Sequence, residues 1–290
     1  AVLLDFRKKY PTQRLAADIK SKLIVDYEAQ EMWGDAAFEL KNIAENSTKA
    51  EEQRIATSQS AEYYEKAGDL NNARDMFRTY AHRYPTPFDP AVEAHYRLDQ
   101  IYAQMGEEEN RQFWLAKIIS LHNNAGSQQS DRSRYLAASA AFQLGEIERK
   151  KFEAVAITIP LDKSITTKNN LLLAAQKRYT QAAQSNVQEF TTSSTYHLGQ
   201  LYADMSTALM ESERPQGLDE LELEEYEFLI EEQVFPLEEA AIQIHQTNSA
   251  RTRDGLYDRW IKDSFKSLAK LMPGQYNKQE RVVTYVDQIR

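Results

Sequence analysis

The chain has 290 residues, a formal net charge of −9 at pH 7, 42% hydrophobic residues and no cysteine. This acidic balance argues against a nucleic-acid partner, because a phosphate-binding face needs a stripe of basic residues. The lack of cysteine excludes disulfides and thiolate metal ligands. No run in the sequence approaches the roughly 18 apolar residues that a membrane-spanning helix needs.

Three tyrosines at nearly regular spacing mark the ends of predicted helices: Tyr27, Tyr64 and Tyr102. The residues that follow Tyr64 fit a helical hairpin with a turn glycine, a small residue for close approach, two aromatic packing residues and a terminal proline. They are Gly68, Ala73, Phe77, Tyr80 and Pro85. These offsets match the second half of a tetratricopeptide repeat, a helix–turn–helix unit of about 34 residues.

The same register recurs around the other tyrosines. Tyr27 precedes Ala36, Leu40 and Ile43, with Glu31 at the usual glycine position, and Tyr102 precedes Gly106, Leu115 and Ile118. Farther along, Leu198-Gly199 leads to a fourth tyrosine, Tyr202, and Leu144-Gly145 repeats that signature with Glu148 in the tyrosine position. The pattern predicts an all-α fold, a single right-handed solenoid over residues 1–290 whose first helices line the concave wall.

Two insertions are expected to lengthen the array, at about residues 152–170 and 213–236. Thr158 to Thr167 is rich in β-branched residues and contains Pro160, which predicts an irregular loop before a helix from Leu171 to Gln184. In the second insertion a long helix ends near Ser212, and an acidic helix begins near Asp219. Pro236 is expected to kink or interrupt this acidic helix.

Both ends of the sequence read as parts of repeats. The chain opens without methionine on Phe6, Tyr10 and Pro11, which resemble the tail of a second helix. Residues 279–290 place Val282, Val283, Val286 and Ile289 at helical spacing, as in a capping helix or the first helix of another repeat. We therefore expect the chain to be a fragment of a longer protein.

Motifs for catalysis are missing from the sequence. The nine glycines never come closer together than 18 residues, which excludes a P-loop and a dinucleotide-binding fingerprint. The five histidines include no pair at a spacing of three or four residues on one helix. We therefore expect a protein that is not an enzyme and that carries no cofactor and no metal.

Repeat geometry selects the candidate binding residues, because certain positions of the first helices point into the concave groove. These positions are Glu62, Glu65 and Lys66 in one repeat, Tyr96, Gln100 and Gln104 in the next, and Tyr196, Gln200 and Asp204 in a later one. The last two sets share a ladder of tyrosine, glutamine and a polar residue that suits hydrogen bonding to an extended peptide. The alternative is that these residues merely face solvent.

The helix after Asp219 is unusually acidic. Between Asp219 and Glu232 there are eight carboxylates, of which Glu222, Glu224 and Glu225 are candidates for docking a basic partner. The alternative is a solvated helix face. An apolar stripe is expected to pack on the array and brace the helix from Leu256 to Leu271, burying Trp260 and Phe265 at the junction. The stripe comprises Tyr226, Leu229, Ile230, Val234 and Phe235.

Several longer segments resemble a known group of proteins. Phe77 to Ala103 is similar to tetratricopeptide proteins of the Gram-negative envelope. The resemblance is sharper from about Thr195 to Glu280. It includes Ala208-Leu209-Met210-Glu211-Ser212-Glu213-Arg214-Pro215, Tyr226 to Pro236, Leu256 to Phe265, and Leu271-Met272-Pro273. This part looks like the C-terminal portion of repeat proteins associated with ExbB/ExbD/TonB-type proton-driven complexes, including relatives from gliding-motility machinery.

The resemblance implies periplasmic residence, a scaffold role beside an inner-membrane motor, and other envelope proteins as partners. It supplies no catalytic residues. Two hypotheses follow from the sequence: a protein-interaction scaffold of the periplasm, or a carbohydrate-binding or glycan-processing envelope module built on the insertions.

Overall fold

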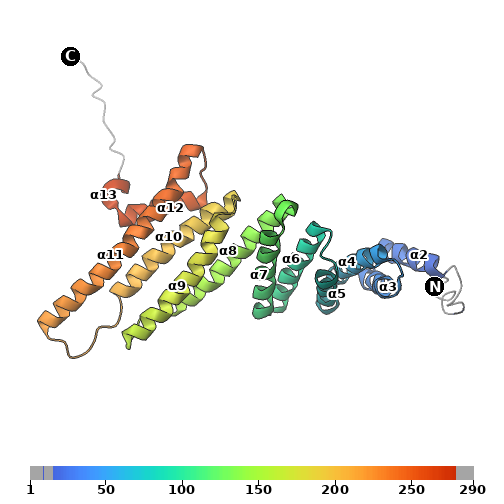
Figure 1. Cartoon of the computed structure of the whole chain (residues 1–290), viewed down its shortest axis with the longest axis horizontal. Helices are drawn as coiled ribbons and strands as arrows, with labels where there is room; N and C mark the ends of the chain where they lie inside the picture. Colours follow the sequence, from blue (N-terminus) through green and yellow to red (C-terminus); the bar gives the residue numbers. More distant parts are fainter. Residues whose placement is uncertain (1–8, 10–15, 279–290) are drawn as a thin grey trace, which may run out of the picture. The chain divides into compact units, whose positions relative to one another are not determined.

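The computed structural model describes residue 9 and residues 16–278, in which helices are joined by short turns and loops and no strand occurs (Figure 1). The all-α fold class is therefore confirmed. The described helices are α2 (Ala16–Ala29), α3 (Trp33–Asn46), α4 (Ala50–Lys66), α5 (Leu70–Arg83), α6 (Phe88–Met105), α7 (Glu108–Asn124), α8 (Asp131–Ala154), α9 (Leu161–Ala183), α10 (Gln188–Met210), α11 (Glu220–Ala250), α12 (Arg259–Leu271) and α13 (Pro273–Tyr276), with short 3₁₀ helices at Gly126–Gln128 and Arg251–Asp254. The expectations for Phe6, Tyr10, Pro11 and residues 279–290 lie outside the described residues.

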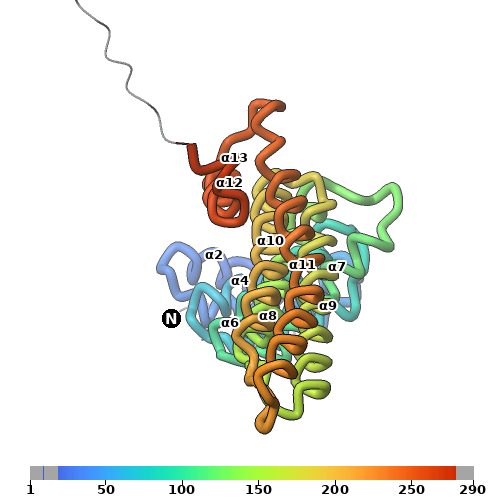
Figure 2. The backbone as a smooth tube through the Cα atoms, turned by 90° about the vertical axis from the view of Figure 1, so that its left-hand side faces the viewer, coloured from blue at the N-terminus to red at the C-terminus, as the bar shows by residue number. Residues whose placement is uncertain are grey.

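The chain divides into two compact units, with the boundary after Ala137 inside α8. In unit 1, each helix from α2 to α7 packs against the next one along the chain. In unit 2, α9, α10, α11 and α12 pack in the same order, and α10 and α11 lie side by side in both Figure 1 and Figure 2. Consecutive packing is what a helical repeat requires. The single tetratricopeptide solenoid over the whole chain stays a prediction.

Three hairpin turns of unit 1 have the same hydrogen bonds. The amide of the fifth residue after Tyr27, Tyr64 and Tyr102 donates to the carbonyl of that tyrosine, with N–O distances of 2.9, 2.9 and 3.0 Å. The amide one residue earlier donates to the carbonyl of the residue after the tyrosine, at 3.1, 3.0 and 3.2 Å. This is a Schellman motif, whose penultimate residue must be left-handed. Glu31, Gly68 and Gly106 occupy it with φ of 55°, 77° and 72°.

The packing positions also recur in register. Ala36 and Ala73 are fully buried where two helices meet, and Leu40 and Phe77 are buried four residues later. Burying a side chain such as Phe77 stabilises the fold by roughly 1.5–3 kcal/mol. After Tyr102 the equivalent position holds Arg111 in place of the small residue, and its guanidinium Nε lies 3.0 Å from Oδ1 of the buried Asp99. The tyrosine register therefore locates the core of unit 1 correctly.

The Leu-Gly signatures of unit 2 mark helices that touch an aromatic ring. A Cβ atom at Gly145 would lie 2.8 Å from Cε1 of Tyr179, and one at Gly199 would lie 2.7 Å from Nε2 of His245. Neither gap admits a methyl group, so close approach of the helices requires glycine at both sites. Tyr179 on α9 and His245 on α11 thus occupy equivalent places in successive helix pairs.

The predicted loop from Thr158 to Thr167 is wrong over most of its length. Only residues 155–160 are irregular, and α9 begins at Leu161, ten residues earlier than expected. The β-branched residues are accommodated in the helix, and the hydroxyls of Thr166 and Thr167 donate to carbonyls four residues earlier. The ammonium of Lys168 also donates to the carbonyls of Phe152 and Val155, at 2.9 and 2.6 Å, and satisfies the end of α8.

The acidic helix begins where the sequence predicts but does not break at Pro236. Asp219 caps α11, accepting from the amide of Glu222 at 2.9 Å, while the Glu222 side chain accepts from the amide of Asp219 at 3.0 Å. The helix then continues through Pro236 to Ala250, so the expected interruption is wrong. Proline removes one amide donor, and Glu232, whose carbonyl loses that donor, lies on an exposed part of the helix where water can replace it.

The apolar stripe expected on α11 is only partly correct. Ile230 and Val234 are buried in the core of unit 2, where Tyr226 and Leu237 pack against it. Leu229 and Phe235 are instead mostly exposed. Spacings of four, four and three residues keep the inner positions on one helical face, whereas Leu229 and Phe235 each lie about 100° away from a buried neighbour.

Trp260 and Phe265 are half-buried, so their expected burial at the α11–α12 junction is wrong. The inward face of α12 is formed by Ile261, Ser264 and Leu268, at helical spacing. The fully buried Asn248 joins three helices here. Its side-chain amide donates to the Thr192 carbonyl of α10 at 3.1 Å and to the Ser264 hydroxyl of α12 at 2.9 Å.

The turn residues give a test of the repeat geometry. Replacing Glu31 with glycine should stabilise the chain by about 0.5–1 kcal/mol. A left-handed residue with a Cβ costs roughly 1–2 kcal/mol, and glycine removes this cost. Part of the gain is lost because glycine gives the unfolded chain more conformational entropy. Gly106→Ala should destabilise the chain by about 1 kcal/mol for the same reason. Urea unfolding of both variants measures the two shifts. Changes of the same sign would contradict the equivalence of the turns.

Candidate functional site

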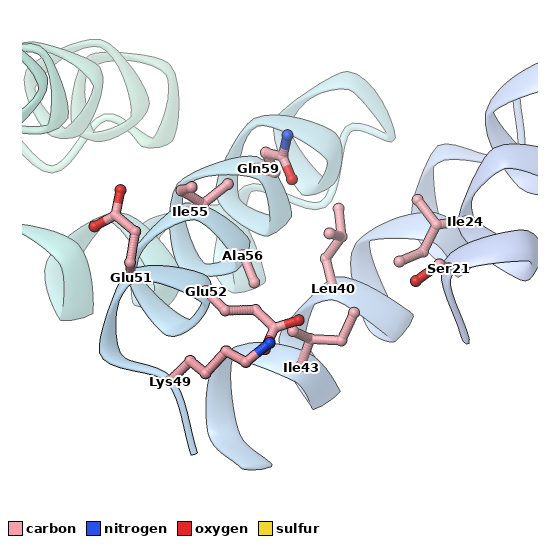
Figure 3. A pocket seen from close by; sticks show the side chains of 10 residues that line it. All are labelled: Ser21, Ile24, Leu40, Ile43, Lys49, Glu51, Glu52, Ile55, Ala56 and Gln59. Carbon is pink, nitrogen blue, oxygen red and sulfur yellow. The ribbon is translucent and has the colours of Figure 1, made fainter. Parts of the chain in front are cut away.

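A pocket of about 510 Å³ opens between α2, α3 and α4, and we call it the apolar pocket (Figure 3). Ile24 of α2 and Ala56 of α4 stand on either side of Leu40, which forms the floor together with Ile43. Ile55 on the rim is 42% exposed. The remaining lining residues are polar: Ser21, Lys49, Glu51, Glu52 and Gln59. An apolar floor with a polar rim suits a single apolar side chain of a ligand.

A second pocket of about 400 Å³ lies between α4, α5, α6 and the first turn of α8, and we call it the charged pocket. Phe77 and Ala94 supply its apolar surface. Its other lining residues are Ser58, Glu62, Asp89, Pro90, Glu93, Arg97 and Arg132. The Arg132 guanidinium forms three hydrogen bonds to the Glu93 carboxylate: Nε and Nη2 donate to Oε2 at 3.1 and 3.0 Å, and Nη2 also donates to Oε1 at 3.2 Å.

The two pockets occupy equivalent places along the row of helices in unit 1. Each lies between consecutive first helices, over the second helix that connects them. Their lining residues are equivalent when the residues of α4 and α6 are counted from Tyr64 and Tyr102, and the floor residues from Tyr27 and Tyr64. The pairs are Ala56 and Ala94, Ile55 and Glu93, Gln59 and Arg97, and, on the floor, Leu40 and Phe77. A segment that crosses α2, α4 and α6 would meet first an apolar site and then a charged one.

The structure brings some of the predicted groove residues of unit 1 together at the charged pocket. Glu62 lines it and forms no ion pair within the described part of the chain. The Arg132 guanidinium lies 5.3 Å from the ring centroid of Tyr96, and Nη1 of Arg97 lies 3.3 Å from Oε1 of Glu65. The exposed Lys66 lies elsewhere, with its ammonium 4.6 Å from the ring centroid of Trp33.

The predicted glutamine ladder is engaged within its own helices. The Gln100 amide donates to Oδ2 of Asp99 at 2.7 Å, and the Gln200 amide donates to Oδ1 of Asp204 at 2.9 Å. Burial raises the pKa of Asp99 and of Asp204, and the arginine beside Asp99 offsets part of that rise. Of this ladder, Gln104 is exposed. Both glutamines therefore help to satisfy carboxylates before any ligand is present.

Tyr196 packs inside unit 2 instead of standing free in a groove. Its ring centroid lies 5.6 Å from that of His245 and 5.4 Å from that of Trp260. Tyr196 and Tyr96 belong to different units, so a common wall that contains both stays a prediction. On α11, Glu222 closes the capping box, whereas Glu224 and Glu225 are exposed.

The sequence prediction missed several residues that line the pockets: Leu40, Ile55, Gln59, Glu93, Arg97 and Arg132. The tyrosine register carries a signal for most of them, because Ile55 and Glu93 each stand nine residues before their tyrosine. No local pattern identifies Arg132, since it enters the pocket from the next helix pair. Its place depends on the Glu93 carboxylate and the Tyr96 ring.

His245 is the most unusual titratable group near the predicted residues. Its side chain is fully buried against Gly199, and neither ring nitrogen has a hydrogen-bond partner among the described residues. Burial lowers the pKa of His245 to about 4. The neutral ring is therefore part of the packing between α10 and α11.

No family model matches this chain, and no curated protein matches its sequence. Over the described residues, no helix combines the length and the apolar character that crossing a membrane requires. The same residues contain no group of three or more histidine, aspartate or glutamate side chains arranged to hold a metal ion.

His245 makes folding depend on pH. In the unfolded chain His245 binds a proton near pH 6.5, but in the folded chain its pKa is about 4. Its neutral form therefore costs no folding free energy above pH 6.5, and the free energy of unfolding falls as the pH drops from 6.5 to 4. The loss should be about 3 kcal/mol. His245→Phe keeps an aromatic ring, as Tyr179 does at the equivalent site, and should remove this contribution. Chemical unfolding at several pH values tests it, and an unchanged pH slope in the variant would contradict it.

Proposed function

We propose that the chain is a non-enzymatic protein-interaction scaffold whose first unit binds an extended peptide segment. The observation that carries this proposal is the recurrence of a pocket at equivalent positions of successive repeats. Such a row presents side-chain sites at the repeat period along one face, which suits a chain-like ligand better than a compact small molecule. Burial of one apolar side chain and pairing of one charge would supply most of the affinity.

The chemistry of the two pockets specifies the peptide. Leu40 and Ile43 in the apolar pocket favour a leucine, isoleucine or phenylalanine side chain. In the charged pocket Glu93 is neutralised by Arg132, and Asp89 already accepts from the Ser130 hydroxyl at 2.6 Å. Neither Asp89 nor Glu62 forms an ion pair among the described residues, and Glu62 also accepts no side-chain hydrogen bond there. It favours a lysine or arginine at the corresponding place in the peptide.

The setting we propose is the periplasm of a Gram-negative bacterium. The resemblance of residues 195–280 to repeat proteins of ExbB/ExbD/TonB-type complexes supports this setting, and the absence of cysteine is compatible with an oxidising compartment. In this proposal the chain is an adaptor that holds envelope proteins beside an energy-transducing complex. The peptide groove of unit 1 would be one of its contact surfaces.

A random peptide library displayed on phage tests the groove with no partner assumed. The wild-type chain should enrich peptides that carry an apolar residue and a basic residue at a fixed separation. Ile55→Glu places a charge on the rim of the apolar pocket and should weaken those peptides at least roughly tenfold. Glu62→Gln should remove the preference for the basic residue and leave the apolar one.

Glu109→Gln supplies the control for this experiment, because Glu109 is exposed on α7 and lines neither pocket. It should bind the selected peptides as the wild type does. Enrichment of no common sequence, or equal binding by Ile55→Glu and the control, would reject peptide binding in the groove.

A further inference from the structure

The outward face of α11 carries a straight line of large apolar side chains. Leu221, Phe228 and Phe235 are 67%, 61% and 65% exposed and stand at intervals of seven residues. Residues seven apart lie almost above one another on an α-helix, and this line is about 21 Å long at 1.5 Å per residue. Single exposed apolar residues are ordinary on a protein surface, but an aligned row on one helix is not.

This row is not a part of the hydrophobic core. The inner face of α11 is already supplied by Ile230 and Val234, which are buried, and by Tyr226 and Leu237, which pack against the core of unit 2. Within unit 2, α11 packs against α10 on this inner side, and α12 joins it. The outward row therefore contributes little to folding and is available to another molecule.

Carboxylates border the row on both sides. Glu224 and Glu231 stand on one side, and Glu225 and Glu232 on the other, each three or four residues from two members of the row. None of these four forms an ion pair within the part of the chain that the structure describes. The sequence contains no lysine or arginine from Pro215 to Ala250, so α11 itself supplies no cation to neutralise them.

We propose that this face of α11 docks a basic amphipathic helix of another protein. The partner helix would place apolar residues at seven-residue spacing against Leu221, Phe228 and Phe235, and lysine or arginine on its flanks against the glutamates. The seven-residue spacing repeats one position of a coiled-coil heptad, and in such helix pairs apolar contacts supply affinity while flanking charges select the partner. A length of 21 Å corresponds to about four turns of such a helix.

The charges decide between this partner and two others. Two copies of this face would bring glutamates against glutamates, and like charges across an interface oppose association. An anionic membrane surface would be repelled in the same way.

The proposed site is separate from the peptide groove, because it lies in unit 2 and recognises a helix instead of an extended segment. An experiment that rejects the peptide groove therefore leaves the helix-docking face untouched, and the reverse also holds.

The test uses a synthetic peptide of about 18 residues, built from leucine at the first and fourth positions of each heptad with lysine on the flanks and alanine elsewhere. The wild-type chain should bind it, with an affinity that weakens as salt is added. Phe228→Ala combined with Phe235→Ala should weaken binding at least roughly tenfold. Both side chains are largely exposed, so this variant should unfold at the same urea concentration as the wild type.

Glu225→Gln combined with Glu232→Gln should weaken binding less and reduce its salt dependence. Its matched control is Glu109→Gln combined with Glu189→Gln, which makes the same charge change at exposed positions on α7 and α10. The control should bind as the wild type does. Equal binding by the phenylalanine double variant and the wild type would overturn the proposal.

Two further measurements would also reject a basic helix as the occupant. One is a sedimentation experiment in which the wild type is a dimer and the phenylalanine double variant is a monomer, because a second copy would then cover the face. The other is binding to anionic phosphatidylglycerol vesicles that the same variant abolishes, because a lipid surface would then be the occupant.

Discussion

The helices of both units approach each other closely at positions that have room for a methyl group at most. Ala36 and Ala73 serve this purpose in unit 1, and Gly145 and Gly199 do so against the rings of Tyr179 and His245 in unit 2. Close approach brings the larger residues of each pair into full contact, and dispersion and burial then hold the pair together. A methyl group at either glycine would have to displace an aromatic ring.

The candidate binding sites follow from the same constraint. When each helix pair packs tightly, the spaces that remain lie between neighbouring first helices, and they recur with the repeat. In unit 1 this produces the apolar pocket and the charged pocket over Leu40 and Phe77. The helix packing determines where the pockets lie. The residues at equivalent positions, such as Ile55 in one pocket and Glu93 in the other, determine the chemistry of each pocket. A scaffold can in this way alter its ligand without altering its fold.

Unit 2 differs from unit 1 in the length of one helix, α11, and this helix carries a second kind of surface. α11 has 31 residues, longer than the 14 of α3 or α5, and it buries only one face. The outward face keeps an apolar row between glutamates, although no core residue requires it. The buried side of the same helix holds His245, which packs against Gly199 of α10. Protonation of His245 would therefore weaken the packing between α10 and α11 and leave the outer surface unchanged.

Local sequence patterns are enough to predict the helical class, the turns after Tyr27, Tyr64 and Tyr102, and the start of α11 next to its cap Asp219. These features depend on residues close together in the chain: a left-handed position, a cap and a spacing of three or four. Three other features are visible only in the folded chain: Thr158 to Thr167 is mostly helical, Pro236 lies within a continuous helix, and Trp260 is half-buried. Each of these depends on what packs against the segment. Lys168 satisfies the end of α8, solvent reaches the exposed turn before Pro236, and the inward face of α12 is set by its contacts with α10 and α11. The pockets also belong to this second group, since Arg132 and Glu93 meet only when the helices are in place.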